Sequence, residues 1–270
     1  MIMKFIDIHS HFNLHEFDED RDAAVARLRD ADGGTITIGT DQTSSQLAVD
    51  LADQHDHLWA TVGLHPADNT GEVFDANFYR NLARHDRVVG IGECGFDYFR
   101  IEKTAVEIQR QEKAFRAQIE LAIELDLPLM LHIRASKGTY DAYDDVLAIL
   151  REYKAEAREK LRGDAHFFAG TAGHMQQFID LGFYVSFTGV ITFTHDYDDL
   201  VKSAPIDRIF AETDAPYVAP TPYRGKRCEP HHVQSVITRM AQLREMPEAD
   251  LQKQLLKNIE TLWGIVVRRD

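Results

Sequence analysis

The chain has 270 residues, 44% hydrophobic and 27% charged, a composition that allows a sizeable core and is typical of a globular protein. Its formal net charge of −14 argues against a protein that coats long duplex DNA through a broad basic surface. We predict one domain over residues 1–270 and a cytoplasmic location, because the sequence has no apolar run of transmembrane length, no signal-peptide pattern and two widely separated cysteines, Cys94 and Cys228.

Eight short runs rich in apolar or β-branched residues recur along the chain. They fall at residues 5–11, 35–39, 58–63, 88–93, 129–132, 165–168, 183–187 and 209–214. Most are nearly continuous in apolar residues, as parallel strands buried on both faces should be. Between them, apolar residues recur at helical spacing in segments such as 103–126, 143–162 and 247–263. This alternation predicts a (β/α)8 TIM barrel, with an open doubly wound sheet as the alternative.

Residue types that bind metals stand in or at the ends of five of these runs. His9 and His11 are two positions apart, so in a strand they share a face. In a TIM barrel the active site is built at the carboxyl ends of the strands, where such side chains converge. Together the runs supply six candidate ligands: His9, His11, Glu93, His132, His166 and Asp214. Each alone is explained by a polar strand end, but the set predicts a shared metal site.

The chemistry of this set is specific. Four imidazoles and two carboxylates suit borderline divalent ions such as Zn, Mn or Fe better than an ion that prefers oxygen ligands alone. Six ligands are too many for one catalytic ion that keeps an open position. They suit two divalent metal ions about 3.5–4 Å apart, bridged by a carboxylate. A water between the ions would lose its proton near neutral pH and act as the nucleophile, with a nearby carboxylate as the proton acceptor.

Six motifs, in order along nearly the whole chain, resemble the signatures of one family. They are Asp7-Ile8-His9-Ser10-His11, Gly63-Leu64-His65-Pro66, Gly92-Glu93-Cys94-Gly95-Phe96-Asp97-Tyr98, Leu131-His132-Ile133-Arg134-Ala135, His166-Phe167-Phe168-Ala169-Gly170, and Glu212-Thr213-Asp214-Ala215-Pro216-Tyr217 with Arg224-Gly225-Lys226. Their sequence resembles the TatD family of metal-dependent deoxyribonucleases, in the amidohydrolase superfamily. The resemblance implies a (β/α)8 barrel that hydrolyses DNA phosphodiester bonds, often as a 3′→5′ exonuclease.

The resemblance also implies a role for each candidate ligand. His9, His11 and Asp214 would hold the first metal, Glu93 would bridge both metals, and His132 and His166 would complete the second. Asp214 would also act as general base. The family is usually described as magnesium-dependent, whereas this set is rich in histidine, so Zn, Mn, Fe and Mg all stay candidates.

Four departures from the family pattern remove no ligand. Phe167 and Ala169 replace the usual Cys and Ser beside the sixth-run ligand, Ala135 replaces an acidic residue, and Cys228 replaces an Asn. They weaken the inference of this chain's substrate from the family more than the inference of its metal site.

Four further residues are candidates for substrate binding. His65 closes the third run and either faces the pocket or stabilises a turn. Arg134 and Arg224 stand at a strand end and in a loop, where an arginine can grip a phosphate with two parallel hydrogen bonds or simply be solvated. Tyr217 either stacks on a base or packs on the barrel rim. Asp97 and Glu212 are candidates for orienting the ligands or for forming ion pairs.

Three functions follow from these observations. The favoured one is a hydrolase of DNA, at single strands or ends, that uses a two-metal-activated hydroxide. The alternative is hydrolysis of a small phosphate, ester, lactone, amide or aminoacyl substrate, because metal hydroxides also attack carbonyls. The third is a barrel that only binds a partner or metal. We predict no membrane association and no obligate protein partner.

Overall fold

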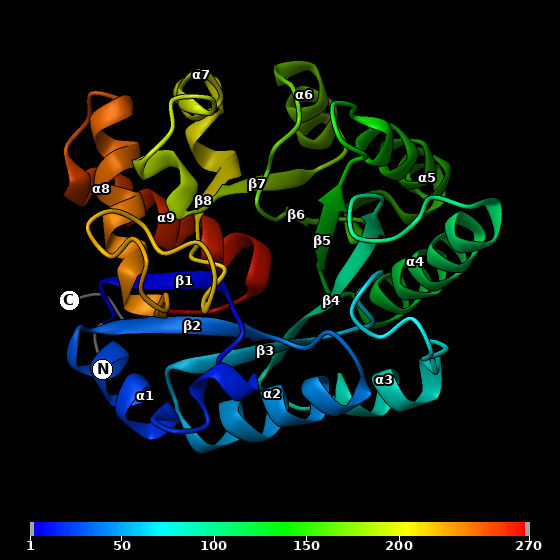
Figure 1. Cartoon of the computed structure of the whole chain (residues 1–270), viewed down its shortest axis with the longest axis horizontal. Coiled ribbons are helices and arrows are strands. Elements are labelled where there is room, and N and C mark those ends of the chain that lie inside the picture. The colour runs from blue at the N-terminus through cyan, green and yellow to red at the C-terminus, as the bar shows by residue number, and fades with distance from the viewer. Residues whose placement is uncertain (1–2, 268–270) are drawn as a thin grey trace.

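A computed structural model describes residues 3–267, and the eight strands in this range form one parallel sheet (Figure 1). The strands pair in chain order: β1 Phe5–Ser10, β2 Gly33–Ile38, β3 Leu58–Val62, β4 Val88–Asp97, β5 Leu129–Arg134, β6 Gly163–Ala165, β7 Phe183–Phe187 and β8 Ile209–Ala211. The sheet closes where the segment after β8 meets β1. There the Asp214 amide donates to the His9 carbonyl at 2.9 Å, and the His11 amide donates to the Ala215 carbonyl at 2.7 Å. The predicted (β/α)8 barrel is confirmed.

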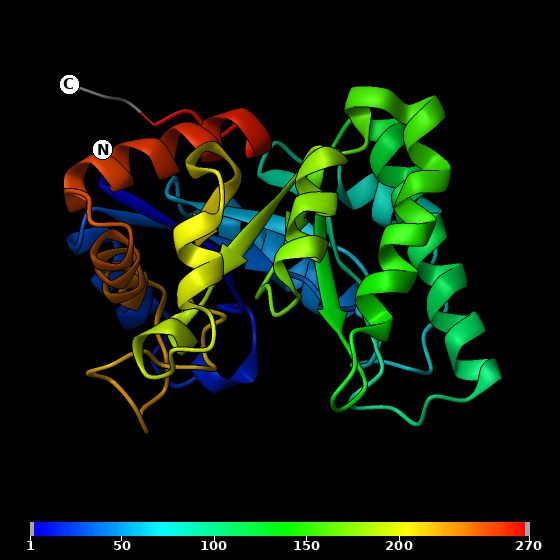
Figure 2. The ribbon, with the colours of Figure 1, turned by 90° about the horizontal axis from the view of Figure 1, so that it is seen from above.

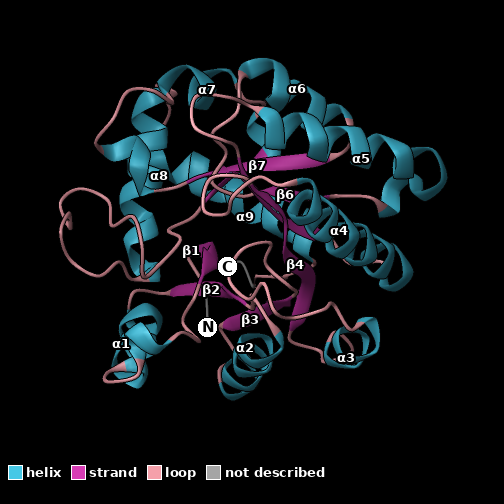
Figure 3. Ribbon diagram, turned by 45° about the vertical axis from the view of Figure 1, so that its right-hand side comes forward, coloured by secondary structure: helices cyan, strands magenta, loops and turns pink. Residues whose placement is uncertain are grey.

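Helices follow the strands and form a ring around them (Figure 3). Those of six residues or more are α1 Arg21–Asp30, α2 Gln42–Gln54, α3 Ala76–Leu82, α4 Ala105–Leu125, α5 Asp141–Ala157, α6 Ala172–Asp180, α7 Asp198–Ser203, α8 Val233–Leu243 and α9 Glu248–Trp263. Side-chain caps fix several starts: Asp41 and Ser44 form a capping box at α2, and Thr104 caps α4. Within residues 3–267, no helix combines the length and apolarity needed to cross a membrane.

Two buried clusters divide the barrel into layers. The larger lies between the strands and the surrounding helices. The smaller joins side chains from seven of the eight strands to α9, which is possible only if those side chains point into the barrel. Ile259, Leu262 and Trp263 are the buried α9 residues of this cluster. Figure 2 shows α9 across one end of the barrel and the loop after β8 at the other. Apolar packing therefore fills one end and leaves the carboxyl ends of the strands for the site.

Two strands end earlier than the sequence predicts. The sixth run was expected at residues 165–168 with His166 inside it, but β6 stops at Ala165. Phe167 adopts φ 47°, in the left-handed region, which ends the extended backbone. The eighth run was expected to end at Asp214, but β8 stops at Ala211, and Asp214 adopts φ 60°. Both predicted ligands thus lie just beyond their strands.

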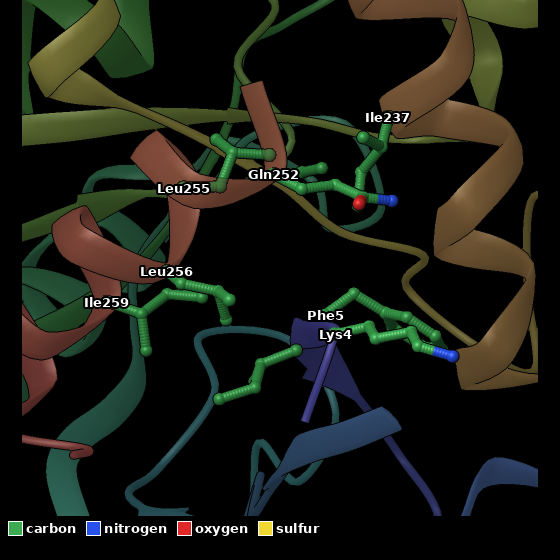
Figure 4. A pocket seen from close by; sticks show the side chains of 9 residues that line it. Lys4, Phe5, Ile237, Gln252, Leu255, Leu256 and Ile259 are labelled. Atoms are coloured by element: carbon green, nitrogen blue, oxygen red, sulfur yellow. The ribbon is translucent and has the colours of Figure 1, made fainter. Parts of the chain in front are cut away.

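A small gap lies between β1 and helices α8 and α9, where Phe5, Ile237 and Leu255 face one another (Figure 4). Its volume is about 10 Å³, close to the space that one water molecule occupies. It is a packing defect too small for a substrate.

Candidate active site

The six candidate ligands meet inside the carboxyl end of the barrel, although they come from five separate strands or strand ends. His9 and His11 lie in and just after β1, Glu93 in β4 and His132 in β5. Glu93 is 3% exposed and sits between the imidazoles. The two oxygens of its carboxylate face different neighbours, so the site has two halves.

The first half surrounds Glu93 Oε2. His9 Nε2 lies 3.3 Å from His11 Nε2 and 3.5 Å from Glu93 Oε2. Asp214 Oδ1 lies 3.4 Å from His11 Nε2 and 3.8 Å from His9 Nε2, and His11 Nε2 lies 3.8 Å from Glu93 Oε2. Ligands 2.0–2.2 Å from a tetrahedral ion are about 3.3–3.6 Å apart. These four atoms therefore have the spacing of a divalent metal site.

The second half surrounds Glu93 Oε1. His132 Nδ1 lies 2.7 Å from this oxygen, and His166 Nε2 lies 3.1 Å from it. The three atoms belong to one group whose potential donor atoms all lie within 4.8 Å of one another. A nitrogen-rich trio that shares a carboxylate with the first half fits a second borderline divalent ion.

Glu212 lies close to one ligand of each half, His9 and His166. The rings of His9 and His166 stack with their centroids 3.8 Å apart. Glu212 Oε2 lies 3.8 Å from His9 Nδ1, and Glu212 Oε1 lies 3.5 Å from His166 Nδ1. The Phe167 amide donates to Glu212 Oε1 at 2.6 Å and holds the carboxylate in place. The geometry gives neither ring a hydrogen bond from Nδ1 to this carboxylate, so Glu212 acts on both imidazoles through its charge.

Asp97 orients His132 through a hydrogen bond. Asp97 Oδ2 lies 3.1 Å from His132 Nε2 and accepts a hydrogen bond from Arg100 Nε at 2.7 Å. Asp97 Oδ1 accepts from the amides of Phe99 and Arg100 at 2.9 and 2.8 Å. With the Asp97 carboxylate on Nε2, the ring is oriented and Nδ1, 2.7 Å from Glu93 Oε1, is the nitrogen available to a metal.

The electrostatics keep the central carboxylates charged. Burial alone would raise the pKa of Glu93, but the surrounding imidazoles, His166 foremost, outweigh it and hold that pKa well below its usual value. Burial likewise opposes ionisation of Asp214, yet its hydrogen bond with His11 and the nearby imidazoles lower its pKa. Both groups are therefore carboxylates at neutral pH, the form that binds a cation.

Two glycines explain how β4 brings Glu93 so close to β5. Gly92 and Gly95 both adopt φ 140°. A Cβ on Gly92 would lie 2.4 Å from the Met130 carbonyl oxygen, and one on Gly95 would lie 2.2 Å from that of His132. Only residues without a side chain permit this approach.

A cavity of about 620 Å³ opens over the site. It is lined by five of the six candidate ligands, all except the fully buried His9. Three of the four predicted substrate-binding residues also line it: His65, Arg134 and Tyr217. The cavity is large enough for a nucleotide-sized group.

His65 lines the cavity beside Arg100. Its Nδ1 accepts from the amides of Ala67 and Asp68 at 2.9 and 3.2 Å. Burial, with His132 nearby, holds the pKa of His65 well below its usual value, so the ring is neutral. Its Nε2 lies 3.0 Å from Arg100 Nη2, which can only donate, and 3.6 Å from Glu93 Oε1. His65 also belongs to a group with Asp97 and His132 whose potential donor atoms lie within 4.8 Å of one another.

The other predicted substrate-binding residues differ in position. Arg134 lines the cavity wall with its guanidinium 4.3 Å above the Phe99 ring. Tyr217 lies at the rim, 48% exposed. Arg224 does not line the cavity: its guanidinium lies 3.8 Å over the Phe193 ring, and Nη1 donates to the Ala219 carbonyl at 2.9 Å. A side chain's direction on a long loop is not encoded in its spacing from a motif.

Some lining residues were not predicted. Asp68 lines the cavity three residues after His65, a spacing within the same turn that could have indicated it. Tyr197 also lines the cavity, but it comes from the loop before α7, which carries no strand-end signal. Of the departures from the family motifs, Phe167 and Ala169 line the cavity, while Cys228 is fully buried.

Comparison with known proteins identifies the family. The model of TatD related DNases matches residues 6–264. The chain belongs to the TatD family. It is 34% identical to the uncharacterised metal-dependent hydrolase YabD of Bacillus subtilis, over 96% of this chain and 98% of that protein. It is also 34% identical to the 3′–5′ ssDNA/RNA exonuclease TatD of Klebsiella pneumoniae, over 97% of this chain and 98% of that protein.

Solved structures agree with this assignment. The crystal structure of YjjV, a TatD homologue from Escherichia coli, aligns with a TM-score of 0.87 and 26% identity, over 98% of this chain and all of that one. The chain is therefore a metal-dependent hydrolase that acts on ester bonds, as the sequence predicts.

Proposed function

We propose that this TatD protein is a two-metal phosphodiesterase that removes nucleotides from single-stranded DNA or from DNA ends. The observation that carries the proposal is the division of Glu93: Oε2 faces His9 and His11, whereas Oε1 faces His132 and His166. A carboxylate with one imidazole pair at each oxygen has the arrangement of a bridge between two ions.

The distances support one ligand assignment. In it, His9, His11 and Asp214 would hold the first ion, His132 and His166 would hold the second, and Glu93 would serve both. When bound, two divalent ions supply charge stabilisation for the phosphoryl oxygens and lower the pKa of a bound water. The histidine content favours Mn, Zn or Fe over Mg at the tighter half.

The protein's own groups do the rest. Asp214 lines the cavity as an ionised carboxylate, so it is the general base that accepts the proton of the attacking water. His65 contacts the substrate from the cavity wall, and Arg134 pairs with a phosphate there. Tyr217 contacts a base at the rim. The TatD relative named as an ssDNA/RNA exonuclease supports this substrate class.

A substrate panel tests the function. The purified protein, supplied with Mn, Zn or Mg, should release mononucleotides from a single-stranded oligonucleotide, and a chelator should abolish the reaction. Hydrolysis of aryl esters or lactones without release of nucleotides would favour the alternative substrate class and overturn the nuclease proposal. A protein that turns over nothing with any divalent ion would contradict both.

The general base has its own test. Asp214→Asn should lower kcat about a hundredfold while substrate still binds, because the side chain keeps its shape but cannot accept the proton. Asp196→Asn is the matched control, since Asp196 is an exposed carboxylate in the loop after β7 whose hydrogen bonds within residues 3–267 are to Thr194. Wild-type turnover by the Asp214 variant would exclude the role.

A further inference from the structure

Exposed aromatic side chains gather on the face that carries the cavity. Among residues 3–267, four Phe, Tyr or Trp side chains are exposed: Phe99, Tyr140, Phe193 and Tyr217. All four lie in loops that follow strands, after β4, β5, β7 and β8 respectively. The outer helices and the end covered by α9 expose none within the described range. Large aromatic rings left in water on one face of an enzyme indicate a binding surface.

Two of these rings are paired with arginines that have no acidic partner. Arg134 lies 4.3 Å above Phe99, and Arg224 lies 3.8 Å above Phe193. Phe99 and Phe193 remain 53% and 43% exposed, so each pair presents both a ring and a guanidinium. No carboxylate in residues 3–267 forms an ion pair with either arginine, although the chain has 44 acidic residues and 30 basic ones.

The neighbouring arginines show the contrast. Arg100 bonds to Asp97 and Asp68, and Arg227 bonds to Asp20 and Glu229, so these cations are already neutralised by the protein. The two Arg–Phe pairs leave their positive charge available to an anionic ligand.

The pairs lie on opposite sides of the site. One joins the ends of β4 and β5, and the other joins the loops after β7 and β8. In a closed sheet with strand order β1 to β8, β4 and β8 are half a turn apart. The second pair also adjoins the cavity wall: the Thr221 amide donates to Thr192 Oγ1 at 2.9 Å, and Val218 in the same loop lines the cavity.

We propose that the Arg134–Phe99 and Arg224–Phe193 pairs form two stacking platforms for a single-stranded nucleic acid that crosses the barrel mouth. On each platform a base stacks on the ring while the guanidinium pairs with the adjacent phosphate. A duplex keeps its base faces stacked inside, so the platforms select single strands. This inference rests on the proposed function and gives Arg224, which lies outside the cavity, a role in substrate binding.

The test compares a long and a short substrate in the metal-loaded enzyme. Phe99→Leu and Phe193→Leu keep apolar bulk but remove the aromatic face. Each should raise KM for a twelve-nucleotide oligothymidylate, relative to KM for bis(p-nitrophenyl) phosphate, by about tenfold, which corresponds to ~1.4 kcal/mol of lost stacking. Phe99→Tyr and Phe193→Tyr should restore the wild-type ratio. Leu47→Ala, at an exposed apolar residue of α2, is the control.

The outcomes separate the two proposals. If wild-type enzyme cleaves the oligonucleotide and the leucine variants keep its KM ratio within twofold, the platforms are excluded and the nuclease function stands. If wild-type enzyme cleaves no nucleic acid, the platforms are tested by the binding of a phosphorothioate oligothymidylate, measured by fluorescence anisotropy. Binding that weakens about tenfold in both leucine variants would keep the platforms, whereas no binding, or equal binding by all variants, would overturn them.

Discussion

Replacement of Asp97 by asparagine tests how the second half of the metal site is held. Asp97 accepts four hydrogen bonds: the Phe99 and Arg100 amides on Oδ1, and Arg100 Nε with His132 Nε2 on Oδ2. An asparagine amide has only one acceptor oxygen. In either orientation of the amide, its NH₂ group would face N–H groups that a carboxylate oxygen accepts from in the wild-type protein. His132 then loses the partner that orients its ring through Nε2, and its Nδ1 is no longer held in place for the second metal.

The expected loss is confined to metal affinity. Removal of a carboxylate that orients a ligating histidine typically weakens metal binding by about 10- to 100-fold, or ~1.4–2.7 kcal/mol. The metal concentration that gives half-maximal activity in Asp97→Asn should rise by this factor. Activity should recover at high metal concentration, because the ligand itself is still present. Metal-dependent rates and calorimetric titration of the metal-free protein measure both quantities.

Asp145→Asn is the matched control for this change. Asp145 accepts a hydrogen bond from Tyr98, the residue next to Asp97, but contacts no candidate ligand. It should leave the metal requirement unchanged. An unchanged half-saturating metal concentration in Asp97→Asn would refute the positioning role, and so would an equal effect of both substitutions.

Two further substitutions test the fold around the site. In Gly95→Ala the new Cβ would lie 2.2 Å from the His132 carbonyl oxygen, so β4 and β5 must separate by about 1 Å, and kcat/KM should fall about a hundredfold. Arg227→Ala should lower Tm by about 3 °C at pH 7, because Arg227 links the loop after β8 to Asp20 before α1. Hydrogen bonds from Arg227 and Arg27 lower the pKa of Asp20, so this stabilisation is present above the ordinary aspartate pKa of about 3.9 and disappears as pH falls below it.

Each of these two predictions has a control within the chain. Gly264 also has a positive φ, 67°, but a Cβ there would meet nothing within 4 Å. Gly264→Ala should therefore lower the stability of the protein and leave its activity unchanged. Equal activity losses in the two glycine variants would show that backbone strain, and not contact with His132, is responsible. Arg29 forms only a 3.8 Å pair with Asp30, so Arg29→Ala should leave Tm unchanged. A Tm difference for Arg227→Ala that persists undiminished at pH 2 would contradict the ion-pair explanation.

The sequence predicts the barrel well because buried parallel strands are nearly continuous apolar runs, and their polar ends identify the candidate site. It places His166 and Asp214 near the right strands. It does not predict the backbone conformation there, φ 47° at Phe167 and φ 60° at Asp214. It identifies Glu212 as a candidate for orienting ligands, but not that one carboxylate lies behind both His9 and His166. Such sharing depends on side-chain directions across the barrel, which strand spacing does not specify.

The same limit applies to the loops. Arg224 is close in sequence to the last motif, yet its guanidinium lies over Phe193 and outside the cavity. Tyr197 lines the cavity from a loop without a recognisable pattern. Long loops after strands take their positions from one another, so their contributions become visible only in three dimensions.

The most direct test of the central claim is the metal content of the purified protein by inductively coupled plasma mass spectrometry. After dialysis that removes unbound metal, wild-type protein should retain two divalent ions per chain. Glu93→Ala, checked for native circular dichroism, should retain less than one, because the carboxylate that serves both halves is gone. A single ion in wild-type protein, or full metal content in Glu93→Ala, would contradict the assignment of Glu93 as the bridge.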